Sequence, residues 1–228
     1  MEMQCSSSKA VIIVAGGVGK RMGGDLPKQY HLLRSKPILI RTLEAVHKSA
    51  PDANIVLVIA KEMFEFWNKM CEDYDCKIKH KLAEAGKERF FSVLSGIKAL
   101  EKENIDLVAV HDGVRCFVNK EIFDNCFSAA EEFGAVVCAC KSIESVRYKN
   151  NAVNRDEVYL VQTPQCFKYD ILKKAYETPY QLSFTDDASV VEALGEKIHI
   201  VEGNRKNIKI TTPLDFKIAD CFIDEGEY

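Results

Sequence analysis

The chain alternates short apolar runs with amphipathic stretches, and this alternation limits its fold more than any other feature. The runs are rich in β-branched residues, which is typical of strands buried on both faces of a sheet; they cover 11–14, 54–60, 107–110 and 135–140. The stretches around them repeat apolar residues at helical spacing and predict helices; they cover 41–49, 62–74, 91–102 and 119–133. Strands separated by helices form mostly parallel sheets, so the sequence predicts an α/β fold with helices on both faces.

The second half of the chain contains a segment that is too polar for the core. Residues 142–161 form two β-type segments around the turn Lys149-Asn150-Asn151, which predicts a hairpin that we call the β-arm. Such an arm reaches over a site or grips another subunit. The other predicted elements are short strands and helices; they cover 77–82, 168–177, 186–194, 198–201 and 207–210. A last helix begins at Thr212-Pro213-Leu214-Asp215, a sequence that suits a capped N-terminus.

The composition is that of an ordinary globular protein and excludes several function classes. With 228 residues, 47% of them apolar, the chain can form a single well-cored domain over 1–228. A formal charge of −3 argues against non-specific binding to nucleic acid. No apolar run is long enough to cross a bilayer, and the first ten residues lack the features of a signal peptide. We therefore expect a cytoplasmic protein with neither a membrane nor a nucleic-acid partner.

Nine cysteines are present, with no Cys-x-x-Cys pair and no Cys/His cluster at zinc spacing. Several lie within apolar strand or helix patterns, where a reduced cysteine acts as a small hydrophobic residue. We therefore expect reduced thiols rather than a disulfide framework or a metal site.

A glycine-rich loop, VAGGVGKRMGGDLPKQY, follows the first predicted strand at 14–30. A Walker loop would need glycine in place of Val14 and Ser or Thr in place of Arg21, and a dinucleotide fingerprint would need glycine in place of Met22. The loop nevertheless combines backbone that can approach an anion with nearby cations; these residues are Gly16, Gly17, Gly19, Lys20, Arg21 and Lys28. It is a candidate phosphate site, or alternatively a glycine-rich turn with a solvated basic face.

A second polar cluster, His111-Asp112-Gly113-Val114-Arg115, follows the strand predicted over 107–110. Magnesium bound to a triphosphate needs only one or two protein carboxylates, which suits Asp112, and the arginine fork of Arg115 suits a phosphate. Asp112 can alternatively be a capping or turn residue. His111 is better explained as a packed histidine that hydrogen-bonds to backbone than as a catalytic one.

A third cluster lies at 207–210, where an alternating strand would place Asn207 and Lys209 on one face. Spacing alone favours a solvated edge lysine at this position. However, ligands of open α/β sheets bind at the carboxyl ends of strands, where all three clusters fall. We therefore expect the three clusters to converge on one site.

Several segments together make the chain resemble a known enzyme family. They are AGGVGKRM, PKQY, GKERFFSV, VHDGVR, VQTPQCF, TDDASVVE and NIKITTP, and they span nearly the whole chain in the family's order. With them the chain resembles the cytidylyltransferases of the non-mevalonate isoprenoid pathway, which join 2-C-methyl-D-erythritol 4-phosphate to CTP. The resemblance implies a three-layer α/β/α, Rossmann-like nucleotidyltransferase fold similar to nucleotide-diphospho-sugar transferases. It also implies that the β-arm clasps a second subunit in a homodimer.

The resemblance further implies a role for individual residues. The CTP phosphates would lie on the backbone of Ala15, Gly16, Gly17 and Gly19, and cytosine and ribose would contact Gly86, Lys87, Arg89 and Ser92. Arg21 and Lys28 would neutralise charge on the α-phosphate and pyrophosphate, and Asp112 would bind magnesium. The sugar phosphate would contact Arg115, Ser145, Thr163 and Lys209, with Arg155 contributed by the partner subunit. The residues that would carry catalysis are Arg21, Lys28, Arg155 and Lys209.

The chain departs from the family pattern in two segments. After His111-Asp112 the family usually has Ala-Ala-Arg-Pro, whereas this chain has Gly113-Val114-Arg115-Cys116. On the β-arm the family commonly has Asp-Thr, whereas this chain has Glu144-Ser145. Ser145 can still donate a hydroxyl hydrogen bond to a phosphate.

Three other functions account for parts of the sequence. A cytidylyltransferase for ribitol 5-phosphate or another polyol phosphate would use the same CTP loop. A sugar-nucleotide glycosyltransferase would need a metal-binding Asp-x-Asp, but Asp73-Tyr74-Asp75 ends a predicted helix and suits a solvated turn. A non-catalytic nucleotide sensor would bind CTP without releasing pyrophosphate, but the presence of several catalytic-type residues together favours an enzyme; they are Arg21, Lys28, Asp112 and Lys209.

Overall fold

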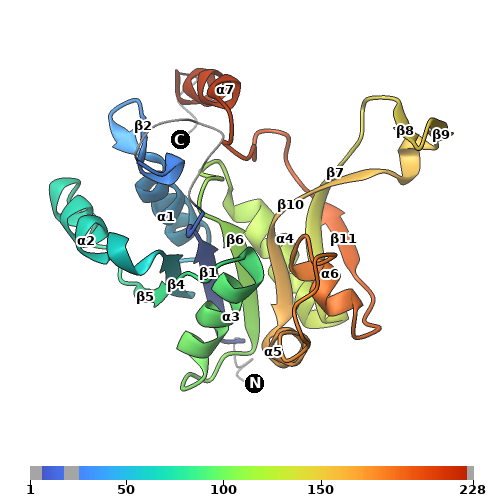
Figure 1. The fold of residues 1–228 in the computed structure, drawn as a ribbon, viewed down its shortest axis with the longest axis horizontal. Helices are drawn as coiled ribbons and strands as arrows, with labels where there is room; N and C mark the ends of the chain where they lie inside the picture. The colour runs from blue at the N-terminus through green and yellow to red at the C-terminus, as the bar shows by residue number, and fades with distance from the viewer. Residues whose placement is uncertain (1–6, 18–25, 225–228) are drawn as a thin grey trace, which may run out of the picture.

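The computed structural model describes residues 7–17 and 26–224, and a mixed β-sheet forms its centre (Figure 1). Within these residues the sheet has seven strands in the order β11-β7-β10-β6-β1-β4-β5. They are β1 Lys9–Val14, β4 Asn54–Ile59, β5 Lys81–Glu84, β6 Leu107–Asp112, β7 Ala135–Lys141, β10 Tyr159–Lys168 and β11 His199–Glu202. Every neighbouring pair is parallel except those that β10 makes with β6 and β7, so the mostly parallel sheet is confirmed.

Helices cover both faces of the sheet and create two hydrophobic cores. The first core contains residues of α1 Ile38–Ser49, α2 Phe64–Asp73 and α4 Lys120–Phe133, and the second contains residues of α3 Arg89–Leu100, α5 Tyr169–Ala175 and α6 Asp187–Glu192. Side chains alternate along each strand and feed both cores. In β1, Val11 and Ile13 enter the first core, while Ala10 and Ile12 enter the second. The predicted three-layer α/β/α architecture is therefore confirmed.

The parallel strands β1 and β6 end side by side at one edge of the sheet, where Val14 pairs with Asp112. The chain then turns at Gly113, where an added Cβ would lie 2.7 Å from the Cβ of Ala15. Real Cβ atoms do not approach so closely, so a residue without a side chain allows the turn after β6 to pack against the loop after β1. The packing of Gly113 thus brings two of the predicted polar clusters together.

A hairpin forms at the predicted turn of the β-arm and projects away from the sheet beyond β7 and β10, although residues 159–161 of the predicted arm belong to β10 (Figure 1). Its hairpin pairs β8 Val146–Tyr148 with β9 Asn151–Val153. Lys149 and Asn150 have φ values of 46° and 66°. Two consecutive positive φ values are what a two-residue hairpin turn requires, since their twist matches that of the strands. The short 3₁₀ helix η3 Arg155–Glu157 then leads back to the sheet at β10.

The main error of the sequence-based assignment is β10, which was not predicted beyond residue 161. This strand runs antiparallel between β6 and β7 and continues through Gln162, Thr163 and Pro164. Two polar residues and a proline interrupt the apolar pattern that would signal a central strand. The register against β7 shifts between Val161 and Gln165, and this irregularity accommodates the interruption.

Two other boundaries also differ from the prediction. Helix α1 begins at Ile38 rather than at residue 41, with Pro37 in the cap position. Strand β5 begins at Lys81 rather than at residue 77, and it pairs with β4 only from there. Both differences arise because tertiary packing, not local periodicity, sets where an element starts.

No strand forms at 207–210, contrary to the prediction. Instead the chain turns, with the Asn207 amide donating to the Asn204 carbonyl at 2.9 Å and the Ile208 amide donating to the Lys206 carbonyl at 2.8 Å. As a result Asn207 is fully buried, whereas the Lys209 side chain is 44% exposed. The predicted common face for Asn207 and Lys209 is therefore wrong.

The predicted helix caps are confirmed. Helix α7 Pro213–Asp224 begins after Thr212, whose amide donates to the Asp215 carboxylate at 2.7 Å while the Asp215 amide donates to the Thr212 hydroxyl at 3.3 Å. At α4, the Ile122 amide donates to the Asn119 side chain at 3.1 Å.

Across residues 7–17 and 26–224, no helix combines the length and apolar character that a bilayer crossing demands.

Candidate active site

A cavity of about 310 Å³ lies at the carboxyl edge of the sheet, where β1 and β6 end. Most of the predicted site residues line it; they are Ala15, Gly16, Gly17, Lys28, Gly86, Lys87, Arg89, Ser92, Asp112 and Lys209. The predicted convergence of the three polar clusters is thus confirmed for the part of the chain that the structure describes. Gly19, Lys20 and Arg21 lie outside the described residues. A larger hollow, of about 670 Å³, lies at the other end of β4 and contains none of the predicted site residues.

The start of the glycine-rich loop is fixed by its neighbours. An added Cβ on Gly16 would lie 2.2 Å from the Cβ of Ala85, so a larger residue would force the loop away from the segment after β5. The amide group of Gln29 donates to the carbonyls of Ala15, at 2.6 Å, and Gly17, at 3.1 Å. Gln29 is buried, so these bonds form away from competing water. No role for Gln29 follows from the sequence alone, although it lies within the PKQY segment.

Lys28 lines the cavity from the 3₁₀ helix η1 Lys28–Tyr30, which follows this loop. The preceding Pro27 has a φ of −58° and occupies the cap position of η1. A proline with its φ fixed reduces the conformational freedom that is lost when Lys28 is held in place.

Asp112 is the centre of a cluster of cations at the end of β6. Its carboxylate oxygens lie 2.9 Å from Lys209 Nζ, 3.4 Å from Arg115 Nε and 3.7 Å from Arg89 Nε. Burial alone would raise the pKa of Asp112, but Arg89, Lys209 and Arg115 outweigh it and hold the pKa well below its usual range. Asp112 is therefore ionised at every physiological pH and keeps three positive side chains close together.

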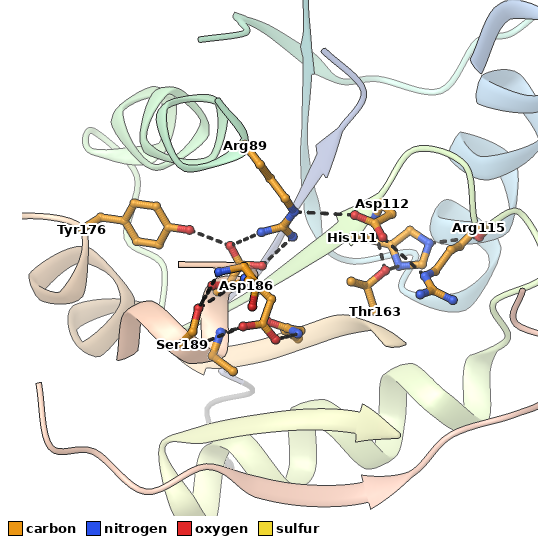
Figure 2. Close-up of polar contacts among 12 residues, drawn as sticks. Arg89, His111, Asp112, Arg115, Thr163, Tyr176, Asp186 and Ser189 are labelled. Atoms are coloured by element: carbon orange, nitrogen blue, oxygen red, sulfur yellow. Dashed lines mark hydrogen bonds and ion pairs between the residues drawn. The ribbon is translucent and has the colours of Figure 1, made fainter. Parts of the chain in front are cut away.

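His111 is a structural residue, as the sequence predicts. It is fully buried, its Nε2 lies 3.0 Å from the Arg115 carbonyl, and its Nδ1 lies 3.2 Å from the Thr163 hydroxyl (Figure 2). A carbonyl can only accept, so Nε2 carries the proton and Nδ1 accepts from Thr163. Burial lowers the pKa of His111 to about 4, which keeps the ring neutral. The Thr163 hydroxyl in turn accepts from the Asp112 amide at 3.0 Å, so Thr163 holds both residues in place.

Arg115 points away from the cavity lining but supports it. Its Nη1 donates to the Asn207 carbonyl at 2.7 Å, and the Asn207 side chain donates to the Thr163 carbonyl at 2.8 Å. These bonds fasten the turn at 204–209 to the segment after β6 and to the middle of β10. The turn thereby presents Lys209 to Asp112, although no strand forms there.

Arg89, at the start of α3, joins Asp112 to a second acidic residue that the sequence analysis did not single out. Figure 2 shows the Arg89 side chain extending from α3 toward Asp112. Its Nη1 and Nη2 also donate to the two oxygens of Asp187, at 2.9 and 2.6 Å. Asp187 is fully buried and also accepts from the Tyr176 hydroxyl at 2.6 Å. Asp187 thus fixes the direction of Arg89, and its only sequence signal was its place in the TDDASVVE segment.

The neighbouring Asp186 has a different task in the same segment. It caps α6 by accepting from the Ser189 amide at 3.0 Å, while the Asp186 amide donates to the Ser189 hydroxyl at 3.2 Å. The Gln165 amide group donates to Asp186 at 2.8 Å and ties this cap to β10. The two adjacent aspartates therefore have different roles: Asp186 caps the start of α6, and Asp187 anchors Arg89.

The remaining cavity residues belong to the start of α3. The Gly86 amide donates to the Ser92 hydroxyl at 3.1 Å, and that hydroxyl donates to the Glu88 carbonyl at 3.2 Å. These bonds shape the turn that precedes the helix. By contrast, Ser145 and Arg155 are exposed on the β-arm and do not line the cavity within the chain.

No group of three or more His, Cys, Asp or Glu side chains that could hold a metal ion occurs within residues 7–17 and 26–224. Asp112 is the carboxylate of the cavity lining that lies nearest the cations, and Glu88 is the other acidic residue of the lining. A site of this kind suits magnesium only when phosphate oxygens and water supply most of the ligands. The single carboxylate of Asp112 fits that requirement.

Comparison with known proteins agrees with this geometry. The family model described as 2-C-methyl-D-erythritol 4-phosphate cytidylyltransferase matches residues 9–225. A protein of that name from Bacteroides fragilis is 45% identical over 219 residues, covering 94% of this chain and 99% of the relative. The crystal structure of 4-diphosphocytidyl-2C-methyl-D-erythritol synthase from Anaerococcus prevotii superposes with a TM-score of 0.81 at 29% identity, covering 96% of both chains.

A crystal structure of 2-C-methyl-D-erythritol 4-phosphate cytidylyltransferase from Francisella tularensis is also similar. It has a TM-score of 0.77 at 32% identity, and the match covers 94% of this chain and 99% of that one. Sequence and structural similarity therefore extend over nearly the whole chain. The chain belongs to the 2-C-methyl-D-erythritol 4-phosphate cytidylyltransferase family.

Proposed function

We propose that this enzyme transfers the cytidylyl group of CTP to 2-C-methyl-D-erythritol 4-phosphate, giving 4-diphosphocytidyl-2-C-methyl-D-erythritol and pyrophosphate in isoprenoid precursor synthesis. The observation that carries the proposal is the charge of the cavity, which four cationic and two acidic side chains line beside a glycine-rich backbone. Concentrated positive charge and close backbone approach favour a polyphosphate ligand. Family membership then identifies the two substrates.

The CTP phosphates would lie against Ala15, Gly16 and Gly17, with Lys28 beside them. Gly16 supports this placement because it is held where a side chain has no space. Cytosine and ribose would lie toward the start of α3, where the bonds between Gly86, Ser92 and Glu88 fix the turn. The fixed position of the turn would limit the entropy lost when the nucleoside binds.

Asp112 would hold magnesium together with phosphate oxygens, and its depressed pKa keeps it ionised for that purpose. The ion would supply charge neutralisation on the phosphates. Lys209, whose side chain is 44% exposed, can leave Asp112 and pair with a phosphate. Arg115 and Arg89 would stay with Asp112 and Asp187, because both make further hydrogen bonds there.

In the reaction, an oxygen of the 4-phosphate attacks the α-phosphorus of CTP while the bond to the pyrophosphate oxygen breaks on the opposite side. The protein provides little covalent chemistry, so positioning and charge stabilisation account for most of the rate enhancement. Lys28 and Arg21 would stabilise the charge that develops on the α-phosphate and the leaving pyrophosphate. Lys209 and Ser145 would orient the attacking sugar phosphate, and Arg115 and Thr163 would hold the Lys209 turn and Asp112 in place behind it.

A direct assay tests the activity and the acceptor together. The purified chain is incubated with CTP, magnesium and either 2-C-methyl-D-erythritol 4-phosphate or ribitol 5-phosphate, and pyrophosphate release is measured. We expect kcat/KM to be at least about tenfold higher for the methylerythritol substrate. The two acceptors differ in a methyl branch, in chain length and in one hydroxyl, and a change of even one carbon in a shaped site provides that much discrimination. Equal values, or a preference for ribitol 5-phosphate, would contradict the proposed acceptor. Absence of pyrophosphate release with both would contradict the reaction itself.

The β-arm would clasp a second copy of the chain, and Arg155 would act in the partner's site. The support within the chain is that Arg155 is exposed on η3, outside the cavity lining.

A mixing experiment distinguishes this arrangement from action within one chain. Lys28→Ala and Arg155→Ala are each expected to be nearly inactive. After mixing and exchange of subunits, half of the dimers are mixed and one site in each has both wild-type residues.

Activity in the mixture should therefore recover to about a quarter of the wild-type value, because a two-fold dimer has two equivalent sites. If Arg155 serves its own chain, every site in the mixture lacks one residue and no activity returns. A monomer in light-scattering measurements would also contradict the proposal.

A further inference from the structure

The C-terminus of α2 ends in a tight, well-defined backbone motif. Asp75 has a φ of 48°, in the left-handed region. The Asp75 amide donates to the Glu72 carbonyl at 3.1 Å, and the Cys76 amide donates to the Cys71 carbonyl at 2.8 Å. This pair of bonds, with a left-handed residue between them, is the Schellman motif that closes many helices. The Asp73-Tyr74-Asp75 triplet therefore forms a helix end, in agreement with its predicted role as a turn.

The Schellman motif places two cysteines next to each other. The residues at the two ends of its longer hydrogen bond usually make a hydrophobic side-chain contact. Here both are cysteines, since the Cys76 amide donates to the Cys71 carbonyl, so the two thiols occupy the positions of that contact. Backbone bond lengths limit the Cα–Cα distance across their 2.8 Å amide–carbonyl bond to about 7 Å. The pair therefore meets the Cα–Cα distance requirement of a disulfide.

The Cys71–Cys76 pair differs from the other thiols that the structure describes. Cys116, Cys126, Cys138, Cys140 and Cys166 are buried, whereas Cys71 and Cys76 are half-buried at the end of a surface helix. Accessibility to a small reagent and a neighbouring thiol are both needed for disulfide formation. Cys221 is exposed, but it lies on α7 and has no cysteine beside it in the sequence.

The two thiols also differ from each other in acidity. The hydrogen bond from Cys71 lowers the pKa of the Cys76 thiol below its usual range, and the amide of Ile78 acts in the same direction. Burial and the nearby Glu44 raise it, and Lys36 lowers it slightly. The same hydrogen bond, followed by burial, raises the pKa of Cys71. One thiolate next to one protonated thiol is the arrangement of a nucleophilic and a resolving cysteine.

We propose that Cys71 and Cys76 are a redox-active dithiol, which a hydroperoxide oxidises to an intramolecular disulfide. The Cys76 thiolate attacks the peroxide, the O–O bond breaks, and a sulfenic acid and hydroxide form. Hydroxide takes the proton of Cys71, whose thiolate then attacks the Cys76 sulfur. The S–S bond forms as the S–O bond breaks, and the hydroxide released takes up the proton that Cys76 had lost. In total, two thiols and one hydrogen peroxide give one disulfide and two waters.

The chain carries its own reporter of this reaction. Trp67 is its only tryptophan and lies one helical turn before Cys71 on the same face of α2. Trp67 is fully buried, and its indole N–H donates to His80 at 2.9 Å. Disulfides quench indole fluorescence at short range, so oxidation of the pair should reduce the emission. The quenching should reverse when a dithiol reductant is added.

Mass spectrometry provides the decisive measurement. The full-length protein is reduced, treated with graded hydrogen peroxide, alkylated and digested with trypsin, which releases residues 70–77 as one peptide containing both cysteines. We expect this peptide to lose two hydrogens and to resist alkylation. Its oxidation should be roughly tenfold faster than that of Cys221, because the acidic Cys76 thiol supplies the reactive thiolate. The fluorescence decrease should follow the same peroxide dependence.

Serine variants separate the two roles. In Cys71→Ser the reaction should stop at a Cys76 sulfenic acid, which dimedone traps, whereas in Cys76→Ser little dimedone adduct should form on Cys71. Circular dichroism verifies that both variants fold. The proposal is overturned if both cysteines of the wild-type protein remain alkylatable at peroxide levels that oxidise Cys221. It is also overturned if the pair forms disulfides only between different molecules.

Discussion

Replacing Asp187 with asparagine tests how the site holds Arg89. Asp187 accepts two hydrogen bonds from Arg89, at 2.9 and 2.6 Å, and one from Tyr176, at 2.6 Å. It is fully buried, so water cannot replace these partners. Asparagine keeps the size of the side chain but removes the charge, and its NH₂ group would face the guanidinium. The variant therefore leaves a positive charge without its closest counter-charge and without a change in volume.

The expected loss of stability follows from the geometry. Removing one partner of a buried ion pair costs about 3–5 kcal/mol. Here the Arg89 side chain is 29% exposed and Asp112 remains 3.7 Å away, and both reduce the penalty. We therefore expect the lower limit, about 3 kcal/mol, which for a chain of this length lowers Tm by roughly 6–12 °C. Thermal unfolding followed by circular dichroism measures this shift.

The kinetic effect distinguishes positioning from a merely structural role. If Asp187 directs Arg89 toward the nucleotide, Asp187→Asn should raise KM for CTP by about tenfold, equivalent to about 1.4 kcal/mol of binding energy. KM for the sugar phosphate should change little, because Arg89, which Asp187 holds, would contact the nucleoside and not the sugar phosphate. Both constants are measured well below the Tm of the variant, where the protein is folded.

Tyr176→Phe is the matched control. It removes one hydrogen bond to the same carboxylate but keeps the ring, which stacks on Phe90 with centroids 4.6 Å apart. We expect a loss of about 1.5 kcal/mol in stability, typical of a bond to a charged group, and an unchanged KM for CTP. An unchanged KM for CTP in Asp187→Asn as well would refute the positioning role, and a Tm within 2 °C of wild type would refute the estimated pairing energy.

Two other predictions concern catalysis and pH. Lys28→Ala and Arg21→Ala should each lower kcat about a hundredfold or more with little change in Tm; normal turnover by folded Lys28→Ala would refute its role. Because the pKa of folded His111 is about 4 and its unfolded value 6.5, its stabilisation is complete above pH 6.5 and declines toward pH 4. Urea unfolding of the wild-type protein should show a loss of about 3 kcal/mol in the free energy of unfolding between pH 6.5 and pH 4. His111→Asn should lack this loss. Equal losses in the two proteins would contradict a neutral, buried His111.

The layers of the fold could be predicted because the apolar pattern and the burial have the same cause. Strands such as β1 and β4 are buried on both faces, so nearly every residue must be apolar, and this is visible in a single sequence. The full length of strand β10 was not predicted, because the residues in its middle are polar and hydrogen-bond to residues around the site. Thr163 and Gln165 face His111 and Asp186 rather than the hydrophobic cores. Their polar side chains interrupt the apolar pattern from which a buried strand is predicted.

Only those residues of the candidate site that belong to recognisable sequence motifs could be predicted. Asp112 stands out because a charged residue follows an apolar run, whereas Lys209 is indicated only by the family resemblance. Gln29 and Asp187 do not stand out, because their importance depends on partners far along the chain. Gln29 bonds across 14 residues to Ala15, and Asp187 bonds across 98 residues to Arg89. Such pairs follow from how the sheet and helices pack, and no local spacing indicates them.

Asp112 explains why so many cations can lie together at the edge of one small cavity. Two like charges about 4 Å apart repel by about 4 kcal/mol at the effective dielectric of a protein surface, so Arg89, Arg115 and Lys209 would otherwise separate. The single carboxylate offsets this repulsion, and Asp187 and the Asn207 carbonyl fix the two arginines from behind. A phosphate entering the cavity then meets charges that are already assembled, which avoids the cost of gathering them during the reaction. On this reasoning Asp112 organises the cations whether or not it also binds magnesium.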